Sequence, residues 1–489
     1  MITIKDILVK QTTLIESGEQ LCVQGWVKTF RSAGSKNKSN RLGFMKISDG
    51  SCIDHLQVVF SESDLANFDD LVKAKTGACV KVFGKLISSP AKGQTCELAA
   101  TSFEVVGEIS NPDTYPIAKA ELSLEHLRKF PHLRGRTDTL GAVMRIKSAL
   151  SMDVRKYFES VGFYEVHCPT ITDNMCEGGC QTFTCTSLSF EPNSITDFSK
   201  DFFNKRVYLT VSAQLHLECL IMGSLSKAFT MTRAFRAEAS DSKIHTAEIE
   251  MLELEATFST LQENIKVNEE CLKYIINGVL TKCRKDLEFL QSKFKPDLIE
   301  TLERYVINPF AVTTHEECVR LMLEDIASGK VKVDPEKKPE DGLYVFREAP
   351  GFSDDLSKDH EKYICSVLND RIPTFVCNYP AKIKSFYMPK INKGAEIERV
   401  DNFDMLMPDI GEVVGGSQRE SNYDELIERM VESGINPDTM TFYSDLRKYG
   451  TCKHGGSGIG VDRLMLVLTG LNNIRDTTPF FRGYGECMY

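Results

Sequence analysis

Apolar and polar positions alternate in short runs near the start of the chain. Four apolar-rich runs are separated by Gly, Asp and Ser, at 21–27, 44–47, 56–60 and 78–83. Short runs punctuated by turn residues are typical of β-strands. Beyond Thr139 the period becomes that of an amphipathic helix, which runs to about Ser160 with apolar residues at Val143, Ile146, Leu150, Val154 and Phe158.

Changes in composition and in hydrophobic pattern divide the chain into domains. The short strands predict an OB-type barrel over 1–108. Residues 109–137 contain three prolines among several charges, which indicates a hinge. The larger part, 138–489, contains a Lys- and Glu-rich helical stretch at about 256–340, which we interpret as an inserted subdomain. The expected fold class is α+β.

Composition narrows the class of protein. The 489 residues are 42% hydrophobic and 26% charged, which excludes a mainly disordered chain. No uncharged apolar run approaches the roughly 18 to 20 residues that span a membrane, and the first residues lack a signal-peptide core. We therefore expect a cytoplasmic enzyme without a membrane partner and with reduced cysteines. The net charge of −10 argues against indiscriminate binding of nucleic acid.

The predicted barrel carries a candidate nucleic-acid face. The segment 31–41 reads RSAGSKNKSNR and holds four basic residues and no acidic one. OB barrels bind single strands through stacking aromatics beside a basic groove, so Arg31, Phe44 and Gln57 are candidate contacts. The alternative is that Phe44 belongs to the core and the basic segment is a solvated loop.

The segment 230–255 predicts a strand, a polar loop and a second strand. Residues two apart on a strand share a side, so Arg236 and Glu238 would face the same way. Arg236 is suited to clamp a phosphate or carboxylate, and Glu238 to accept from an amino group. A surface ion pair is the alternative.

Two glycine-rich segments carry further charged candidates. In 454–470 the glycines, Gly458 and Gly460 among them, precede a helix that presents Arg463, without the Lys-Ser/Thr of a P-loop. In 402–420, Asp404 and Glu412 are hard oxygen donors suited to Mg²⁺. The alternatives are a solvated Arg463 and structural salt bridges.

A zinc site is disfavoured. Four cysteines cluster near His167, namely Cys168, Cys176, Cys180 and Cys185. Their spacing lacks the closely spaced cysteine pairs that are typical of zinc sites.

Together these segments resemble the class II aminoacyl-tRNA synthetases of the aspartyl, asparaginyl and lysyl subgroup. FRAE, ending at Glu238, resembles motif 2; GSGIGVDR, ending at Arg463, resembles motif 3; and the helix before Pro169 resembles motif 1, which makes the homodimer interface in the family. The segments SDGSCIDHLQVV, LTVSAQLHLE, NYPAKIKSFYMPK and PDIGEVVGGSQRE narrow the resemblance to asparaginyl-tRNA synthetases of the bacterial type.

The resemblance implies a fold and an activity. The expected fold is an N-terminal OB barrel followed by a class II catalytic domain, built on an antiparallel sheet flanked by helices. The expected activity is ATP- and Mg²⁺-dependent activation of asparagine and its transfer to tRNA(Asn) by a homodimer. The rivals are an aspartyl enzyme, an inactive RNA-binding synthetase-like protein, and a free asparagine-making ligase.

The resemblance also assigns residues. Arg236 and Arg463 would be catalytic, and the ATP site would comprise Arg236, Glu238, His245, Glu412, Gly458, Gly460 and Arg463. Asp404 and Glu412 would bind magnesium. The amino acid would meet Glu177, Ser212, Gln214, Glu253 and Arg419. The anticodon would meet Arg31, Phe44 and Gln57.

The chain departs from its relatives at a few positions. Ile244 and Ile249 stand where an Arg and an adenine-stacking aromatic are common, and Asp462 stands where Glu is commoner. Leu217 stands where aspartyl enzymes carry a Lys that neutralises the substrate carboxylate. We therefore expect Arg419 alone to meet the substrate side chain as a cation, with Glu253 or a water accepting from the amide.

Overall fold

The structure is a computed structural model that describes residues 2–33, 41–91, 93–117, 122–174, 181–189, 197–336 and 344–489. It divides into two compact units. Unit 1 contains 1–145 with 288–290, and unit 2 contains 146–287 and 291–489. The division falls inside one helix, α5 (Asp138–Ser160). The boundaries at 108 and 137 stay predictions.

Unit 1 is built on a closed five-stranded barrel in the order β1-β2-β3-β5-β4. Its strands are β1 (Gln20–Ala33), β2 (Leu42–Ser48), β3 (Leu56–Ser61), β4 (Cys79–Ser88) and β5 (Cys96–Gly107). The long β1 pairs with both β2 and β4, which closes the barrel. A Cβ at Gly25 would lie 2.7 Å from the Ser48 carbonyl oxygen, so only glycine fits where β1 crosses the end of β2. Short helices complete the unit: α1 (Ile4–Val9), α2 (Gln11–Ser17), α3 (Leu124–Arg128) and α4 (Pro131–Arg134).

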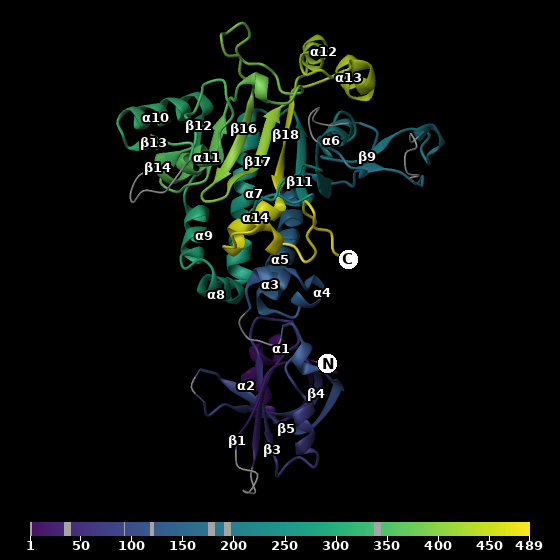
Figure 1. Cartoon of the computed structure of the whole chain (residues 1–489), viewed down its shortest axis with the longest axis vertical. Helices are drawn as coiled ribbons and strands as arrows, with labels where there is room; N and C mark the ends of the chain where they lie inside the picture. Colours follow the sequence, from purple (N-terminus) through teal and green to yellow (C-terminus); the bar gives the residue numbers. More distant parts are fainter. Residues whose placement is uncertain are drawn as a thin grey trace. The chain divides into compact units, whose positions relative to one another are not determined.

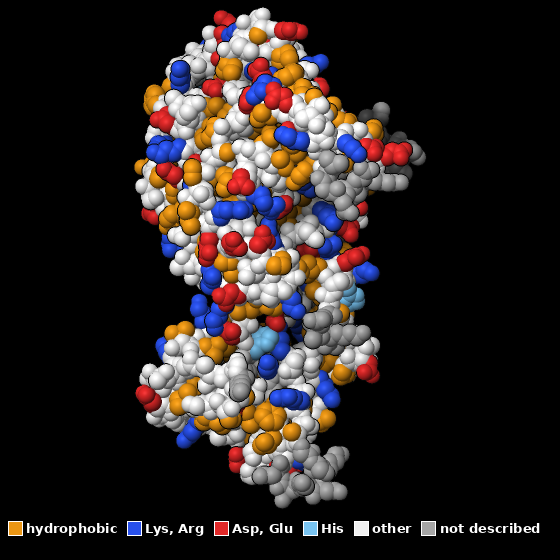
Figure 2. Space-filling model, turned by 90° about the vertical axis from the view of Figure 1, so that its left-hand side faces the viewer, with side chains coloured by type: hydrophobic (Ala, Val, Ile, Leu, Met, Phe, Trp, Pro, Cys, Tyr) orange, Lys and Arg blue, Asp and Glu red, His pale blue; other side chains and the backbone are white. Residues whose placement is uncertain are grey.

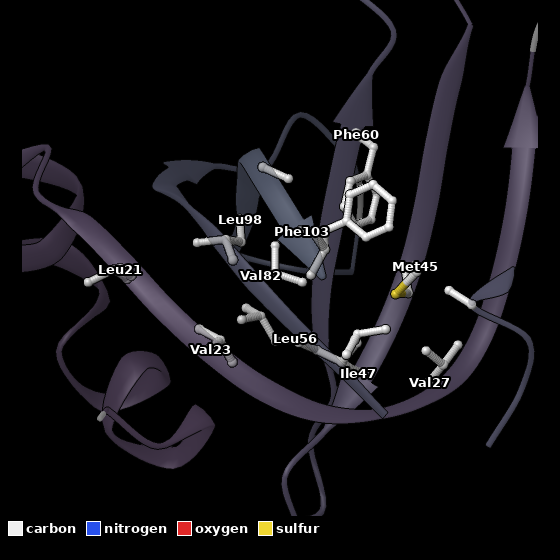
Figure 3. Close-up of a cluster of buried hydrophobic side chains, with 14 of the residues drawn as sticks. Leu21, Val23, Val27, Met45, Ile47, Leu56, Phe60, Val82, Leu98 and Phe103 are labelled. Atoms are coloured by element: carbon white, nitrogen blue, oxygen red, sulfur yellow. The ribbon is translucent and has the colours of Figure 1, made fainter. Parts of the chain in front are cut away.

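Alternate residues of these strands fill the barrel. Figure 3 shows side chains from all five strands meeting inside it, among them Val23, Met45, Leu56, Val82 and Leu98. The ring of Phe60 meets that of Phe103 edge to face at 5.4 Å between centroids. The predicted strands are thus confirmed, and β5 is an additional one.

Unit 2 is built on an eight-stranded sheet in the order β12-β15-β16-β17-β18-β11-β10-β6. Neighbours from β15 to β10 are antiparallel, whereas the outer pairs β12/β15 and β6/β10 are parallel. The strands are β6 (Tyr164–Glu165), β10 (Lys227–Phe235), β11 (Glu248–Thr257), β12 (Ala311–Thr314), β15 (Thr374–Cys377), β16 (Asn402–Met407), β17 (Gly411–Gln418) and β18 (His454–Gly460). In Figure 1, β16, β17, β18 and β11 lie side by side.

Helices pack against this sheet. The predicted amphipathic helix is α5, and its Phe158 ring stacks on Phe229 of β10 at 4.6 Å. The helix α7 (Leu261–Lys282) packs on β18, because Asn264 donates to the Gly456 carbonyl and Asn268 to Ser457. The antiparallel sheet flanked by helices confirms the α+β class.

The remaining elements surround this core. The 256–340 region contains α7, α8 (Arg284–Lys293), α9 (Leu298–Ile307), α10 (His315–Ala327) and the edge strand β12, which joins the main sheet. The other helices are α6 (Gln214–Ile221), α11 (Lys358–Tyr363), α12 (Tyr423–Glu432), α13 (Thr441–Lys448) and α14 (Val461–Thr469). Two small sheets contain β7 (Ile171–Thr172), β8 (Thr184–Cys185), β9 (Val207–Leu209), β13 (Val331–Val333) and β14 (Tyr344–Phe346).

Surface charge is mixed. On the face seen in Figure 2, acidic and basic side chains are interspersed over the described residues. Among those residues, no helix is both long and apolar enough to cross a membrane.

Candidate active site

A cavity of about 450 Å³ opens in unit 2 beside the central strands. Its lining includes every residue predicted to bind ATP: Arg236, Glu238, His245, Glu412, Gly458, Gly460 and Arg463. These residues converge because β11 and β17 both pair with β18, which brings distant segments of the chain together. A larger hollow of about 770 Å³ lies around 380–398, but none of the predicted site residues lines it.

The loop between β10 and β11 closes one wall of the cavity. The antiparallel strands of 230–255 are confirmed, but Arg236 and Glu238 follow the last residue of β10 rather than lying on it. The Arg236 backbone N–H donates to the Ala247 carbonyl at 2.9 Å, which holds the two ends of the loop together. Both side chains still line the same cavity, as expected.

Cations gather at one side of the cavity. Burial, together with Lys358, Arg463 and Arg236, lowers the pKa of His245 to about 4. The Ser242 hydroxyl contacts its Nδ1. Lys358 begins α11, and burial and Arg463 lower its own pKa. This concentration of positive charge suits a polyphosphate. Lys358 lies in no local sequence motif and so was not among the predicted residues.

Asp404 and Glu412 lie over one glycine. A Cβ at Gly415 would be 3.2 Å from Glu412 Oε1 and 3.9 Å from Asp404 Oδ1, so both carboxylates occupy the space above it. Burial raises the pKa of Asp404 to about 6; Lys384 opposes this shift and Glu412 adds to it. Lys384 Nζ donates to Asp404 Oδ2 at 2.5 Å, which the sequence analysis did not foresee.

The fit of this pair to a divalent cation is good but incomplete. Two facing carboxylates are hard oxygen donors whose mutual repulsion a cation would relieve. Among the described residues, however, no group of three or more His, Cys, Asp and Glu side chains converges on one metal position. A magnesium ion would need further oxygen ligands from phosphate or water.

Arg463 bridges the carboxylate side and the cavity. It lies in the first turn of α14, directly after the glycine-rich β18, as predicted. Its Nη1 donates to the Glu412 carbonyl at 2.8 Å and lies 3.4 Å from Glu412 Oε2. Asp462 beside it binds Lys147 Nζ at 2.9 Å and accepts from the Glu250 N–H at 3.0 Å. Both carboxylate oxygens of Asp462 therefore already bond to other residues of the fold.

Two of the residues predicted around the amino acid, Gln214 and Glu253, lie beside Gly458, which lines the cavity. A Cβ at Gly458 would be 3.6 Å from Gln214 Nε2 and 3.8 Å from Glu253 Cγ. Glu253 is buried, and its two oxygens accept from the Ser212 hydroxyl and, at 2.9 Å, from the Ala213 N–H. Glu253 thus fixes the start of α6. Glu177 lies outside the described residues.

Arg419 is buried in a cluster of charges. It pairs with Glu255, donates to Ser417 Oγ at 2.6 Å and lies over the Tyr387 ring at 4.9 Å from its centroid. Burial raises the pKa of Glu255, and Arg419 opposes that shift. The positive charge of Arg419 is therefore partly balanced by Glu255.

Glu218 is a buried carboxylate that the sequence analysis missed. Its Oε2 accepts from Arg447 Nη2 and contacts His454 Nε2, both at 2.8 Å, and Tyr443 donates to its Oε1 at 2.8 Å. Arg419 Nε lies 3.9 Å from Glu218 Oε1. Burial would raise the pKa of Glu218, but Arg447, His454 and Arg419 outweigh it and lower the pKa to about 2. Its four-residue spacing from Gln214 on a helix was the available signal.

Leu217, by contrast, packs in an apolar cluster rather than with the charges around Arg419. It is completely buried in a small apolar cluster with Ile221 and Ala228. A lysine at 217 would have to place its ammonium among these side chains, which is costly. Glu218, rather than position 217, is the neighbour that faces Arg419.

The predicted anticodon residues share one outer face of the barrel. Arg31 and Phe44 are cross-strand partners, and the Arg31 guanidinium lies 5.2 Å from the Phe44 ring centroid. Gln57 pairs across from Lys46, two residues along β2 on the same side. Phe44 is half-buried while Met45 points into the core, so the core alternative for Phe44 is wrong.

Parts of two further segments lie outside the described residues. In the basic segment 31–41, residues 34–40 are not described, and Arg41 pairs with Glu62 and Asp69, each at 2.8 Å. Cys176 and Cys180 are likewise not described, whereas Cys168 and Cys185 are free thiols.

Comparison with known families matches both units. Residues 123–483 match the model described as tRNA synthetases class II (D, K and N). Residues 21–106 match the model described as OB-fold nucleic acid binding domain.

Similarity to curated proteins and to solved structures extends along nearly the full length of the chain. The chain is 40% identical to the asparagine–tRNA ligase of Actinobacillus pleuropneumoniae serotype 3 over 471 residues, 95% of each chain. It is 39% identical to that of Vibrio vulnificus over 469 residues, again 95% of each. Among solved structures, asparaginyl-tRNA synthetase of Pyrococcus horikoshii complexed with asparaginyl-adenylate is similar, with a TM-score of 0.79, 30% identity and 95% of each chain covered.

Proposed function

The chain belongs to the class II tRNA synthetases of the D, K and N group and to the asparagine–tRNA ligases within it, and on that premise we propose that it activates asparagine with ATP and transfers it to tRNA(Asn). The observation that carries the proposal is the junction at Gly458. There the cationic cavity meets Gln214 and Glu253, in the same fold that holds the buried Arg419 and Glu218.

In the first step an oxygen of the asparagine carboxylate attacks the α-phosphorus of ATP. The bond from that phosphorus to the bridging oxygen breaks, and pyrophosphate leaves. Arg236 stabilises the charge that develops on the α-phosphate, and Arg463 that on the leaving group. No side chain acts as a nucleophile. Catalysis then depends on positioning and on fixed charges inside the cavity.

Other cavity residues position the nucleotide. His245 is neutral near pH 7, because its pKa is about 4, and so it can accept or donate a hydrogen bond without adding charge. Glu238 is suited to accept from the amino group of the base. Gly458 and Gly460 leave room for the nucleotide against the backbone of β18.

Asp404 and Glu412 would hold Mg²⁺. When bound, the ion would neutralise phosphate charge and help to orient the triphosphate. Lys384 balances the negative charge of Asp404, and Arg463 balances that of Glu412. The pair is therefore held in place by the protein itself.

Asparagine is selected by opposite charges on its two amide atoms. Arg419 donates to the amide oxygen, and Glu218 accepts from the amide nitrogen. Glu218 is ionised because three donors hold it. The carboxylate of aspartate would meet that charge and be repelled. Ser212, Gln214, Glu253 and Glu177 serve the α-amino group.

In the second step a hydroxyl of the terminal ribose of tRNA attacks the activated carbonyl carbon, and AMP leaves. The barrel face with Arg31, Phe44 and Gln57 binds the anticodon. The Phe44 ring stacks on a base, and the Arg31 guanidinium supplies positive charge for the phosphates.

The enzyme is a homodimer in this proposal, formed through α5 and the outer strand β6. Support comes from the exposed side chains of Met152 on α5 and Tyr164 on β6, which is the last strand of the sheet. Sedimentation should give a mass of twice 55.0 kDa. The proposed location is the cytoplasm, where charged tRNA is used.

Pyrophosphate exchange tests the proposal. Labelled pyrophosphate should enter ATP when asparagine is added, and far less when aspartate or lysine is added. The same preparation should then charge tRNA(Asn). Exchange driven by aspartate as strongly as by asparagine would refute the assignment, and no exchange with any of the three would favour an inactive RNA-binding protein.

A further inference from the structure

The wall of the ATP cavity includes the C-terminal end of the chain. The Ala247 N–H, in the loop that carries Arg236, donates to the Arg482 carbonyl at 2.7 Å. The Ile474 N–H donates to the Lys243 carbonyl of the same loop at 2.8 Å. Tyr484 lies two residues after Arg482 and lines the cavity. The tail is thus joined to the loop by backbone hydrogen bonds.

Tyr484 occupies a defined position in this tail. Gly483 and Glu486 exchange two backbone hydrogen bonds of 2.9 Å, and Gly485 between them has a φ of +73°. This closes a tight turn with Tyr484 and Gly485 at its tip. Arg475 anchors the turn by pairing with Glu486 at 3.2 Å. The same guanidinium contacts Asp241 of the loop.

The Tyr484 ring is open to a ligand. Tyr484 is 63% exposed. Aromatic rings are scarce around it: among the described residues that line the cavity, only Tyr484 and His245 carry one. His245 is surrounded by Lys358, Arg463 and Arg236, and so belongs to the phosphate side. Ile244 and Ile249, which line the same cavity, are apolar and carry no ring.

A purine base needs a flat, polarisable surface, and an exposed aromatic ring at a nucleotide cavity provides one. We infer that Tyr484 stacks on the adenine base of ATP, so that the C-terminal tail forms part of the nucleotide site. This inference rests on the proposed function, because it takes ATP as the ligand of the cavity.

Pyrophosphate exchange with the full chain tests the inference, because its three ligands differ in whether they carry a base. Tyr484→Ala should raise KM for ATP by about 5- to 150-fold, the range for one lost base–aromatic stack. KM for asparagine and for pyrophosphate should stay unchanged, since neither contains a base. Tyr484→Phe should keep the wild-type KM for ATP, and Tyr484→Leu, which has apolar bulk without a ring, should not.

Two further variants separate stacking from a general effect on the tail. Tyr449→Ala removes another exposed tyrosine, 76% exposed, that does not line the cavity, and should change none of the three KM values. Ile249→Phe combined with Tyr484→Ala supplies a ring from β11 and should recover part of the ATP affinity.

Several outcomes would overturn the inference. They are an unchanged KM for ATP in Tyr484→Ala, a parallel rise of all three KM values, and a Tyr484→Leu variant that behaves like wild type. Failure of the proposed function is distinguishable, because it would appear as absent exchange in the wild-type protein.

Discussion

Replacing Glu218 by Gln should abolish the preference for asparagine over aspartate. The substitution keeps the shape of the side chain and removes its negative charge. Glu218 is fully buried and holds its charge through Arg447, His454 and Tyr443, 3.9 Å from Arg419. Because its pKa is about 2, the wild-type Glu218 carboxylate is ionised throughout the range from pH 5 to pH 8.

Two contributions set the size of the effect. The amide of asparagine loses a charge-assisted acceptor, which costs about 1.5 to 3 kcal/mol. Aspartate no longer meets a like charge, and two unit charges about 4 Å apart at an effective dielectric of about 20 repel by about 4 kcal/mol. Together these reduce the ratio of kcat/KM for asparagine to that for aspartate by about 10⁴-fold or more.

Exchange kinetics with each amino acid measure this ratio. Because loss of a buried charge partner costs about 3 to 5 kcal/mol of stability, unfolding of the variant must be followed in parallel. Leu217→Met is the matched control, since it changes the neighbouring residue within its apolar cluster and should leave the ratio alone. A folded Glu218→Gln protein with the wild-type ratio would refute the reasoning.

Three other substitutions test separate parts of the molecule. Arg236→Ala should abolish adenylate formation, seen in exchange, without lowering the melting temperature, because the residue lines a cavity rather than the core. Phe44→Ala should lower kcat/KM for tRNA by about 5- to 150-fold and leave exchange intact; equal damage to both assays would contradict the outer-face role. His315→Gln should make stability less sensitive to acid, because burial, with Arg399 and Lys384, lowers the folded-state pKa of His315 to about 4. With an unfolded value near 6.5, wild type loses stability as pH falls from about 6.5 to 4, so between pH 7 and pH 5 urea unfolding should show a loss about 2 kcal/mol greater than in the variant.

The sequence by itself determined the local elements and most of the candidate residues. The helical period from Val143 to Phe158 became α5, because a face of apolar residues at that spacing must be buried. The glycine-rich segment before Arg463 became β18 and the start of α14. Segment resemblance gave the seven ATP candidates, and all of them line one cavity.

Tertiary structure decided which of these residues meet and what their charges are. Lys358 and Lys384 carry no local signature, and Glu218 has only its helical spacing from Gln214. They matter because strands and helices from distant parts of the chain place them beside His245, Asp404 and Arg419. Phe44 and Met45 are adjacent and both apolar, so only the closed barrel settles which one faces outward. Periodicity fixes which residues share a face of one element, whereas the pairing of distant strands fixes what that face opposes. Charge state depends on that opposition, because burial and neighbouring charges act through space rather than along the chain.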